Sequence, residues 1–191
     1  TAVLGASFVG VQNANAQASA TFEAQVQFQQ ALVLANVSDM DFDTVGVVTD
    51  PPANASTAIM TTDGNIAYSG DFQGSGSGTI GQVDITAGST GTNIEVFCDS
   101  VATLAETGGE QISVNAIGFD FDTTTGTVPA NTCNGSSGSA AGVVSLSSTP
   151  GNLNFGGTLD ASTKTAGFAT EALYSTATGT GSNVVVNVSY Q

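Results

Sequence analysis

Apolar and polar residues alternate along several short stretches of this chain with the two-residue period of a half-buried β-strand. The alternation is clearest between Ala18 and Leu34. Its apolar positions are Ala20, Phe22, Ala24, Val26 and Phe28, and its polar positions are Thr21, Glu23, Gln25, Gln27 and Gln29. A strand with this pattern is expected to bury one face in the core of its own domain and to leave the other face in water.

The same period predicts further short strands along the rest of the chain. They cover residues 39–48, 57–62, 66–72, 83–86, 94–98, 111–122, 143–146, 153–159 and 184–190. Asp63-Gly64 tolerates positive φ and therefore predicts a tight turn that joins the second and third of these strands as a hairpin. The Gly-rich residues 73–81 predict a flexible connection, and residues 168–177 fit a short strand and a helical turn equally well. Ile112, Val114 and Ala116 are expected to share one face of their strand.

Short strands separated by Gly, Ser, Thr and Asn clusters predict an all-β protein. Their number and spacing favour an immunoglobulin-like or pilin-like Greek-key β-sandwich with an N-terminal extension strand. The chain has 191 residues, enough for one well-cored domain. We expect an extension over residues 1–17 and a β-sandwich domain over residues 18–191.

The extension has three interpretations. Taken as a strand it is apolar or small on both faces, so it needs burial on both sides, either in a neighbouring copy by β-augmentation or in its own sheet. The third interpretation is the remnant of a secretory signal, with cleavage at Ala14-Asn15-Ala16 or Ala16-Gln17-Ala18. In the first interpretation Leu4 and Phe8 are the anchors. The polymerisation strand then comprises Val3, Leu4, Ala6, Phe8, Val9 and Val11.

The charge is strongly one-sided, with 16 acidic residues against the single basic Lys164 and a formal net charge of -15. A nucleic-acid partner is excluded, since such affinity rests on Lys and Arg that displace counterions from phosphates. No apolar run is long enough to predict a membrane span. The chain has no histidine, which removes Ser-His-Asp and Cys-His catalysis. We expect no enzyme activity and no cofactor.

Cys98 and Cys133 are the only cysteines, and no histidine accompanies them to complete a zinc site. We expect a disulfide between them, the alternative being two buried thiols. A disulfide is typical of exported proteins, and an extracellular or cell-surface location is predicted.

Two groups of aspartates and four sequons are further candidate sites. Asp39, Asp41 and Asp43 place three carboxylates on one strand face, which suits weak calcium binding, although a solvated strand face is the simpler interpretation. Asp120 and Asp122 repeat this arrangement after Phe119 and Phe121. Glycosylation sequons begin at Asn36, Asn54, Asn134 and Asn187.

Three short motifs carry a family resemblance. They are Met40-Asp41-Phe42-Asp43-Thr44-Val45, Asn154-Phe155-Gly156-Gly157-Thr158-Leu159 and Val186-Asn187-Val188-Ser189-Tyr190-Gln191. With them, residues 18–191 resemble a family of uncharacterised secreted bacterial surface domains that is similar to spore-coat-U-like and fimbrial-subunit β-sandwiches. Where that family usually has Gly after Asp-Phe, this chain has Asp43. The resemblance implies a pilus-like or coat-like surface role and no enzyme activity.

These observations predict a structural subunit of an extracellular pilus-like filament, which polymerises when its N-terminal strand is donated to the neighbouring subunit. Its partners would be other copies of itself, with an assembly chaperone or anchor left unidentified. The alternative is a monomeric secreted binding or adhesion module whose N-terminal strand folds into its own sheet.

Overall fold

The computed structural model describes residue 23 and residues 25–123, 126, 129–169 and 171–191. Within these residues the chain forms thirteen strands, one short 3-10 helix and no α-helix. The elements are β1 (Val33–Ser38), β2 (Gly46–Val47), β3 (Thr57–Met60), β4 (Ile66–Ser69), β5 (Phe72–Gln73), β6 (Gly81–Ala87), β7 (Thr92–Cys98), β8 (Ala102–Ala105), β9 (Gln111–Phe121), β10 (Asn131–Thr132), β11 (Gly142–Leu146), β12 (Gly151–Asp160), η1 (Ala161–Thr163) and β13 (Val186–Tyr190). Among the described residues, no helix has the length and apolar character needed to cross a membrane.

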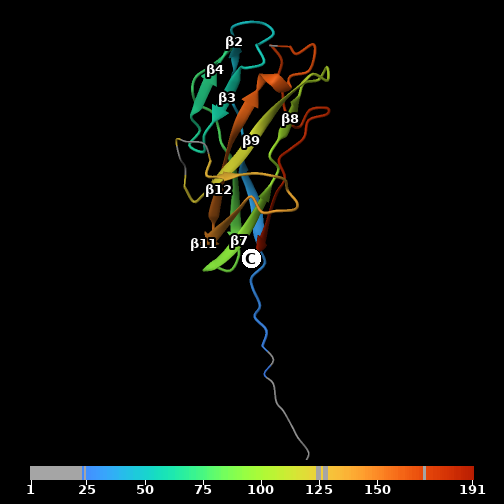
Figure 1. Cartoon of the computed structure of the whole chain (residues 1–191). Coiled ribbons are helices and arrows are strands. Elements are labelled where there is room, and N and C mark those ends of the chain that lie inside the picture. Colours follow the sequence, from blue (N-terminus) through green and yellow to red (C-terminus); the bar gives the residue numbers. More distant parts are fainter. Residues whose placement is uncertain (1–22, 24, 124–125, 127–128, 170) are drawn as a thin grey trace, which may run out of the picture.

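The strands form one large sheet, one three-stranded sheet and one two-stranded sheet, and every pairing is antiparallel. β12 organises the large sheet. One of its edges pairs with β9, and the other pairs first with β6 and then with β3. β1 extends the large sheet beyond β6, while β8 and β10 pair with β9. The second sheet has the order β11-β7-β13 (Figure 1).

A single hydrophobic core joins the two larger sheets. Ile85, Phe119 and Leu153 of the large sheet and Val96 and Leu146 of the second sheet are all buried in it. The all-β prediction is therefore confirmed, and two sheets around one core fit a β-sandwich.

The predicted disulfide is present and connects the two sheets. Cys98 ends β7 in the second sheet, whereas Cys133 follows β10 at the edge of the large sheet, and their sulfur atoms are 1.96 Å apart. Both side chains are buried. The alternative of two buried thiols is wrong, because no free cysteine occurs in the chain.

The predicted hairpin is confirmed as β3 and β4, with Gly64 at φ 84° in the turn. Residues 73–81 follow it without a continuous strand. They are held on both sides, since Gly78 donates its N–H to the Gly64 carbonyl over 2.8 Å and Thr79 exchanges two backbone hydrogen bonds with Asp41.

One predicted face is wrong in its last member. Ile112 and Val114 are buried, but Ala116 is exposed and has a φ of 48°. The register of β9 against β12 shifts between Gly156 and Thr158, so two residues of β9 oppose one of β12. This β-bulge moves Ala116 out of the pleat and returns Ile117 to the core.

The largest correction concerns the predicted strand over residues 18–34. Of its described part, only Val33 and Leu34 are in a strand, and these begin β1. Residues 25–29 leave one end of the body as an extended segment, whereas Gln30 is hydrogen-bonded to the body and Leu32 packs against its core (Figure 1). Val26 and Phe28, expected in the core, are 75% and 88% exposed, because this segment lies beyond the sheets that form the core.

The proposed extension, residues 1–17, lies outside the described residues. Its polymerisation-strand residues Val3, Leu4, Ala6, Phe8, Val9 and Val11 lie there too, as do Ala18, Ala20, Phe22 and Ala24.

Candidate functional site: an apolar groove beside the first and last strands

A groove of about 900 Å³ lies between β1 and the chain segment that ends in β13. One wall is formed by β1 and residues 39–47. The other wall is formed by β8, residues 172–177 and the start of β13. We call this space the groove.

The floor of the groove is the hydrophobic core itself. The floor residues are buried or nearly so: Phe42, Phe72, Ile112, Val114, Ile117, Phe155 and Leu159. Half-buried apolar side chains rise from the floor along both walls: Leu34, Met40, Val45, Val47, Leu104, Phe168, Tyr174, Val184 and Val186. An apolar surface of this size that is open to water is typical of a place where another molecule binds.

Both walls also present backbone edges. In the described part of the chain, β1 pairs only with β6, and β13 pairs only with β7. The opposite edge of each strand therefore carries N–H and C=O groups that no strand among the described residues satisfies, which is a template for an added strand. Near the start of β1 the walls are tied together, because Tyr190 donates its hydroxyl hydrogen to the Gln30 carbonyl and accepts from Ser89 N–H at 2.6 Å.

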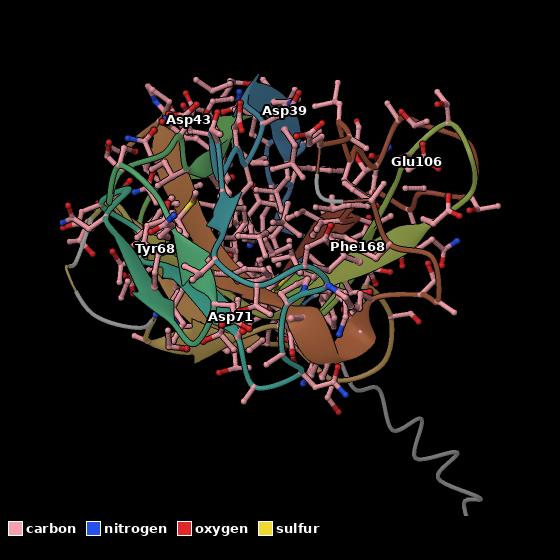
Figure 2. All side chains as sticks on the ribbon, turned by 90° about the horizontal axis from the view of Figure 1, so that it is seen from above. Asp39, Asp43, Tyr68, Asp71, Glu106 and Phe168 are labelled. Atoms are coloured by element: carbon pink, nitrogen blue, oxygen red, sulfur yellow. A yellow bond between two sulfur atoms is a disulfide. The ribbon has the colours of Figure 1, made fainter. Side chains whose placement is uncertain are left out.

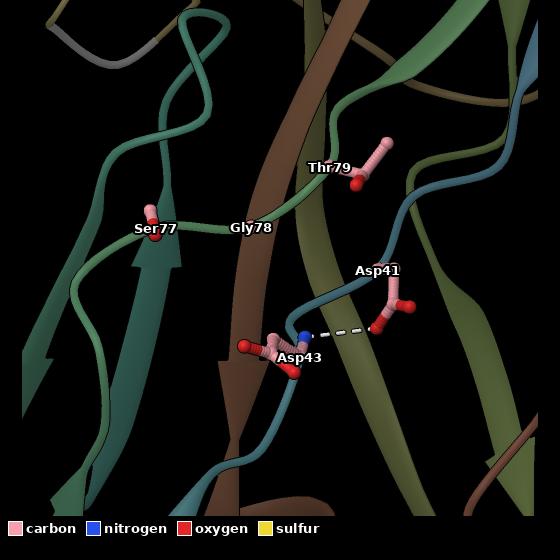
Figure 3. Close-up of a pocket in the computed structure, with 5 residues that line it drawn as sticks. All are labelled: Asp41, Asp43, Ser77, Gly78 and Thr79. Carbon is pink, nitrogen blue, oxygen red and sulfur yellow. Dashed lines mark hydrogen bonds between the residues drawn. The ribbon is translucent and has the colours of Figure 1, made fainter.

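The wall next to β1 ends in an acidic rim formed by Asp39, Asp41 and Asp43. Figure 2 shows Asp39 and Asp43 on the same side of the molecule. The Asp41 carboxylate accepts the N–H of Asp43 over 2.8 Å, and Asp43 has a φ of 56° (Figure 3). An Asx-type turn thus stands where the resemblance implies glycine, since aspartate is among the few residues that adopt positive φ readily.

The calcium hypothesis gains no support from this rim. The small open pocket beside it, about 310 Å³, is lined by Asp41, Asp43 and residues 77–79 (Figure 3). Among the described residues, no group of three or more His, Cys, Asp or Glu side chains could hold a metal ion. Asp39 instead accepts a hydrogen bond from the Asn36 side chain over 2.9 Å.

The second acidic pair of the sequence is likewise structural. Asp120 is 4% exposed and accepts hydrogen bonds from the Thr62 hydroxyl and from Ala130 N–H. Asp122 accepts from Asn152 N–H over 2.6 Å. Both carboxylates join loops and strands within the fold, but only Asp120 is buried, whereas Asp122 is exposed.

The wall opposite β1 contains an aromatic pair. Phe168 and Tyr174 stack with ring centroids 4.7 Å apart and an angle of 19° between the planes. Burial raises the pKa of Tyr174, and the charges of Glu106 and Glu110 raise it further against the hydrogen bond from Ala169 N–H. The ambiguous residues 168–177 are thus neither a strand nor a helix where described, although Ser175 forms a bridge with Ala105. Leu173 stands on the groove rim and is 84% exposed.

The single lysine lies outside the groove. Lys164 Nζ donates to Asn54 Oδ1 at 2.5 Å and to the Ala161 carbonyl at 3.2 Å. This lysine fixes the loop after η1 to the loop before β3, which is a structural use of the only basic side chain.

Sequence reasoning did not find the groove. Its walls come from residues about 150 positions apart, from Leu34 at one end to Val186 at the other, and no local motif indicates that they face each other. The available signal was the strong alternation at both ends of the chain, around β1 and β13. In neither strand does this alternation indicate that one edge lacks a partner strand.

Comparison with known proteins gives no match, since no family model, curated protein or solved structure resembles the chain closely enough to be matched.

Proposed function

We propose that this protein is a structural subunit of an extracellular pilus-like filament, in which each copy donates an N-terminal strand to the groove of the next. The groove is the observation that carries the proposal. It combines an apolar floor with two strand edges that lack a partner in the described part of the chain. An added strand would satisfy both features at once.

Head-to-tail donation joins two different surfaces of the same molecule. Such a heterologous contact need not close into a ring, so it extends into a fibre. The fold within this proposal is a pilin-like Greek-key sandwich, in line with the family resemblance of its three motifs. It is a structural role, without catalysis.

The location outside the cell is part of the same proposal. The Cys98–Cys133 disulfide is supporting evidence, since such bonds persist in oxidising compartments. A net charge of -15 keeps individual copies soluble and makes them repel one another. Assembly must therefore come from burial of apolar surface, which the groove provides.

Electron microscopy and sedimentation of the full chain test the filament. We expect filaments in the wild-type protein. Leu104→Trp, which adds bulk inside the groove, should reduce the sedimenting fraction, while Val143→Trp at the exposed β11 position outside the groove should not. A chain that stays monomeric at high concentration in size-exclusion chromatography would refute the proposed function.

A second candidate is a monomeric secreted binding or adhesion module. The groove volume of about 900 Å³ lies within the range of small-molecule sites, which favours a ligand that occupies the groove of a single copy. A monomeric chain whose melting temperature rises with an added apolar ligand would favour this candidate.

A further inference from the structure

We infer that the donated segment is the alternating stretch of residues 20–28, and that the two-sided apolar lead of residues 3–11 is not the donor. This inference rests on the proposed function and identifies the residues that occupy the groove. Both segments precede the body, so both are candidate donors. They differ in side-chain pattern and in what the structure shows of their surroundings.

The described apolar side chains of residues 20–28 are exposed to water. Val26 and Phe28 are the described apolar side chains of the stretch, and the fold leaves them 75% and 88% exposed. They lie beyond the point where Gln30 is hydrogen-bonded to Ser89 and Tyr190. Two large apolar side chains of the same strand face are thus held in water next to the body, where a second copy can bury them.

The side-chain pattern of residues 20–28 matches the groove. The groove has one apolar floor, so a strand inserted there buries one face and leaves the other in water. Residues 20–28 have one apolar face and one face of Thr, Glu and Gln. Residues 3–11 are apolar or small on both faces, so insertion would leave Val3, Val9 and Val11 exposed whenever Leu4 and Phe8 are buried.

The residues between this stretch and β1 disfavour its insertion into the groove of the same copy. To lie beside its own β1, the stretch would have to reverse direction between Gln29 and Leu32. These four residues, Gln-Gln-Ala-Leu, include none of the Gly, Pro, Asn, Asp or Ser residues that favour tight turns. The β3–β4 turn of the same chain uses Asp63-Gly64. The course of residues 25–29 away from the body agrees with donation to another copy (Figure 1).

Charge agrees as well. The groove rim carries Asp39, Asp41 and Asp43, and this chain is acidic throughout. The outward face of the stretch is neutral at Thr21, Gln25, Gln27 and Gln29, with Glu23 as its one charge. A donor with this face adds little repulsion to the acidic rim, and its glutamine side chains offer amide donors to the carboxylates.

The test compares three double variants of the full chain by sedimentation and electron microscopy. Val26→Asp with Phe28→Asp places two charges on the apolar face. Gln25→Asp with Gln27→Asp places the same two charges on the outward face and is the matched control. Leu4→Asp with Phe8→Asp tests the rival segment. Because Val26 and Phe28 are exposed and make no contribution to the core of their own copy, the melting temperature of their double variant should equal that of the wild type.

We expect the Val26/Phe28 variant to raise the critical concentration for filaments at least about a hundredfold, because burying each side chain is worth roughly one to two powers of ten in association. The other two variants should raise it about tenfold or less, through added charge alone. Loss of filaments in the Leu4/Phe8 variant only would overturn the inference while leaving strand donation intact. Filaments that persist in all three variants would overturn the inference and donation together.

A wild-type chain without filaments would refute the proposed function, and a peptide then decides the inference separately. A fluorescein-labelled peptide of residues 18–30 should bind the monomeric chain, with binding lost in the Leu104→Trp variant. The same peptide with Asp at positions 26 and 28 should not bind. Equal binding of the two peptides, or none, would overturn the assignment of this stretch to the groove.

Discussion

Single aspartates in this protein take roles that their sequence neighbours do not reveal. Asp120 and Asp122 follow phenylalanines in the same way that Asp41 and Asp43 flank one, yet Asp120 is buried and Asp41 lies on the groove rim. The difference comes from the partner loop, since residues near Thr62 and Ala130 cover Asp120 with hydrogen-bond donors. Phe42 and Phe119, which lie next to these aspartates, are both buried. The fate of the polar positions depends on what packs over them.

Asp99 ties the start of β13 to the loop after the disulfide, and its charge should support the fold. Its carboxylate accepts hydrogen bonds from Ser136 N–H at 2.8 Å and from Val185 N–H at 3.0 Å. Partial burial alone would raise the pKa of Asp99, but the bonds from Ser136 and Val185 outweigh burial and lower the pKa. A carboxyl whose pKa is lowered in the folded state stabilises the protein at pH values above the usual aspartate pKa of about 3.9. This stabilisation is lost as the pH falls through the pKa of the folded state.

We therefore expect Asp99→Asn to lower the melting temperature at pH 7 by about 3 to 6 °C, for a loss of about 1 to 2 kcal/mol. The difference from the wild type should shrink below about pH 4, as the pH falls toward and through the lowered pKa of Asp99 in the folded state. Thermal denaturation across this pH range measures it. Glu171→Gln, at an exposed position, is the control and should follow the wild type at each pH. A deficit for Asp99→Asn that is unchanged at pH 2.5 would contradict an electrostatic role for this carboxylate.

Whole strands were predicted well where one uninterrupted period governs them, and poorly where a partner strand changes the register. β6, β7, β11 and β12 lie within a few residues of their expected positions, whereas β8 and β10 were missed. The bulge at Ala116 arises opposite Gly157, so it is a property of the β9–β12 pair. Residues 18–34 failed for a related reason. Their alternation predicts a strand, but the described residues before Val33 are in no strand and have no partner strand.

The Gly156-Gly157 pair shows a physical need behind one of the short motifs. At Gly156 the partner of β12 changes from β6 to β3, and a Cβ atom there would lie 2.4 Å from the Met60 carbonyl oxygen. We expect Gly156→Ala to destabilise the fold by about 2 to 3 kcal/mol, because the backbones of β12 and β3 must move apart. Urea denaturation measures this change.

Gly81→Ala is the matched control in β6. Its added Cβ would meet Phe155 at 3.4 Å, which is an ordinary contact. The free energy of unfolding of this variant should therefore stay within about 0.5 kcal/mol of the wild-type value. Similar midpoints for both variants would mean that β12 and β3 accommodate the methyl group without cost.

The disulfide holds two sheets that the core alone also joins, so its contribution is measurable by difference. It closes a loop of 35 residues. In the chain-entropy description, removing such a crosslink costs about 4 kcal/mol. Replacing both Cys98 and Cys133 with Ala should lower the urea midpoint of unfolding accordingly. The midpoint of the wild type measured in reductant should fall by a similar amount. A variant as stable as the oxidised wild type would show that packing between the sheets suffices.

The groove belongs to the assembled molecule, and no part of the sequence carries it alone. β1 and β13 lie near opposite ends of the described chain. β1 pairs with β6 in the large sheet, and β13 pairs with β7 in the second sheet. Composition did indicate how copies would interact, since 16 acidic residues and one lysine leave almost no attraction between like surfaces. The position of the acceptor had to come from three-dimensional structure. The donor that we propose, in contrast, is visible in the sequence as the cleanest alternation of the chain, once the exposure of Val26 and Phe28 is known.

This charge would give the filament that we propose a distinctive response to salt. Assembly driven by opposite charges weakens as salt rises, whereas assembly of copies that each carry -15 should strengthen, since salt screens their repulsion. The Debye length falls from about 30 Å at 0.01 M to about 8 Å at 0.15 M ionic strength, which is less than the size of a domain. Between these conditions we expect the critical concentration, measured by sedimentation in sodium chloride at pH 7, to fall about tenfold.

Salting-out of the folded chain would imitate this response, so the Val26→Asp, Phe28→Asp variant provides the control. It carries two more negative charges and lacks the two exposed apolar side chains of the donor face. If screening acts on strand donation, the variant stays in the supernatant at both salt concentrations while the wild type moves into the pellet. A variant that sediments with salt as the wild type does would show that salt acts on the general solubility of the fold, and a wild-type filament that dissolves as salt rises would mean that charge attraction holds the copies together.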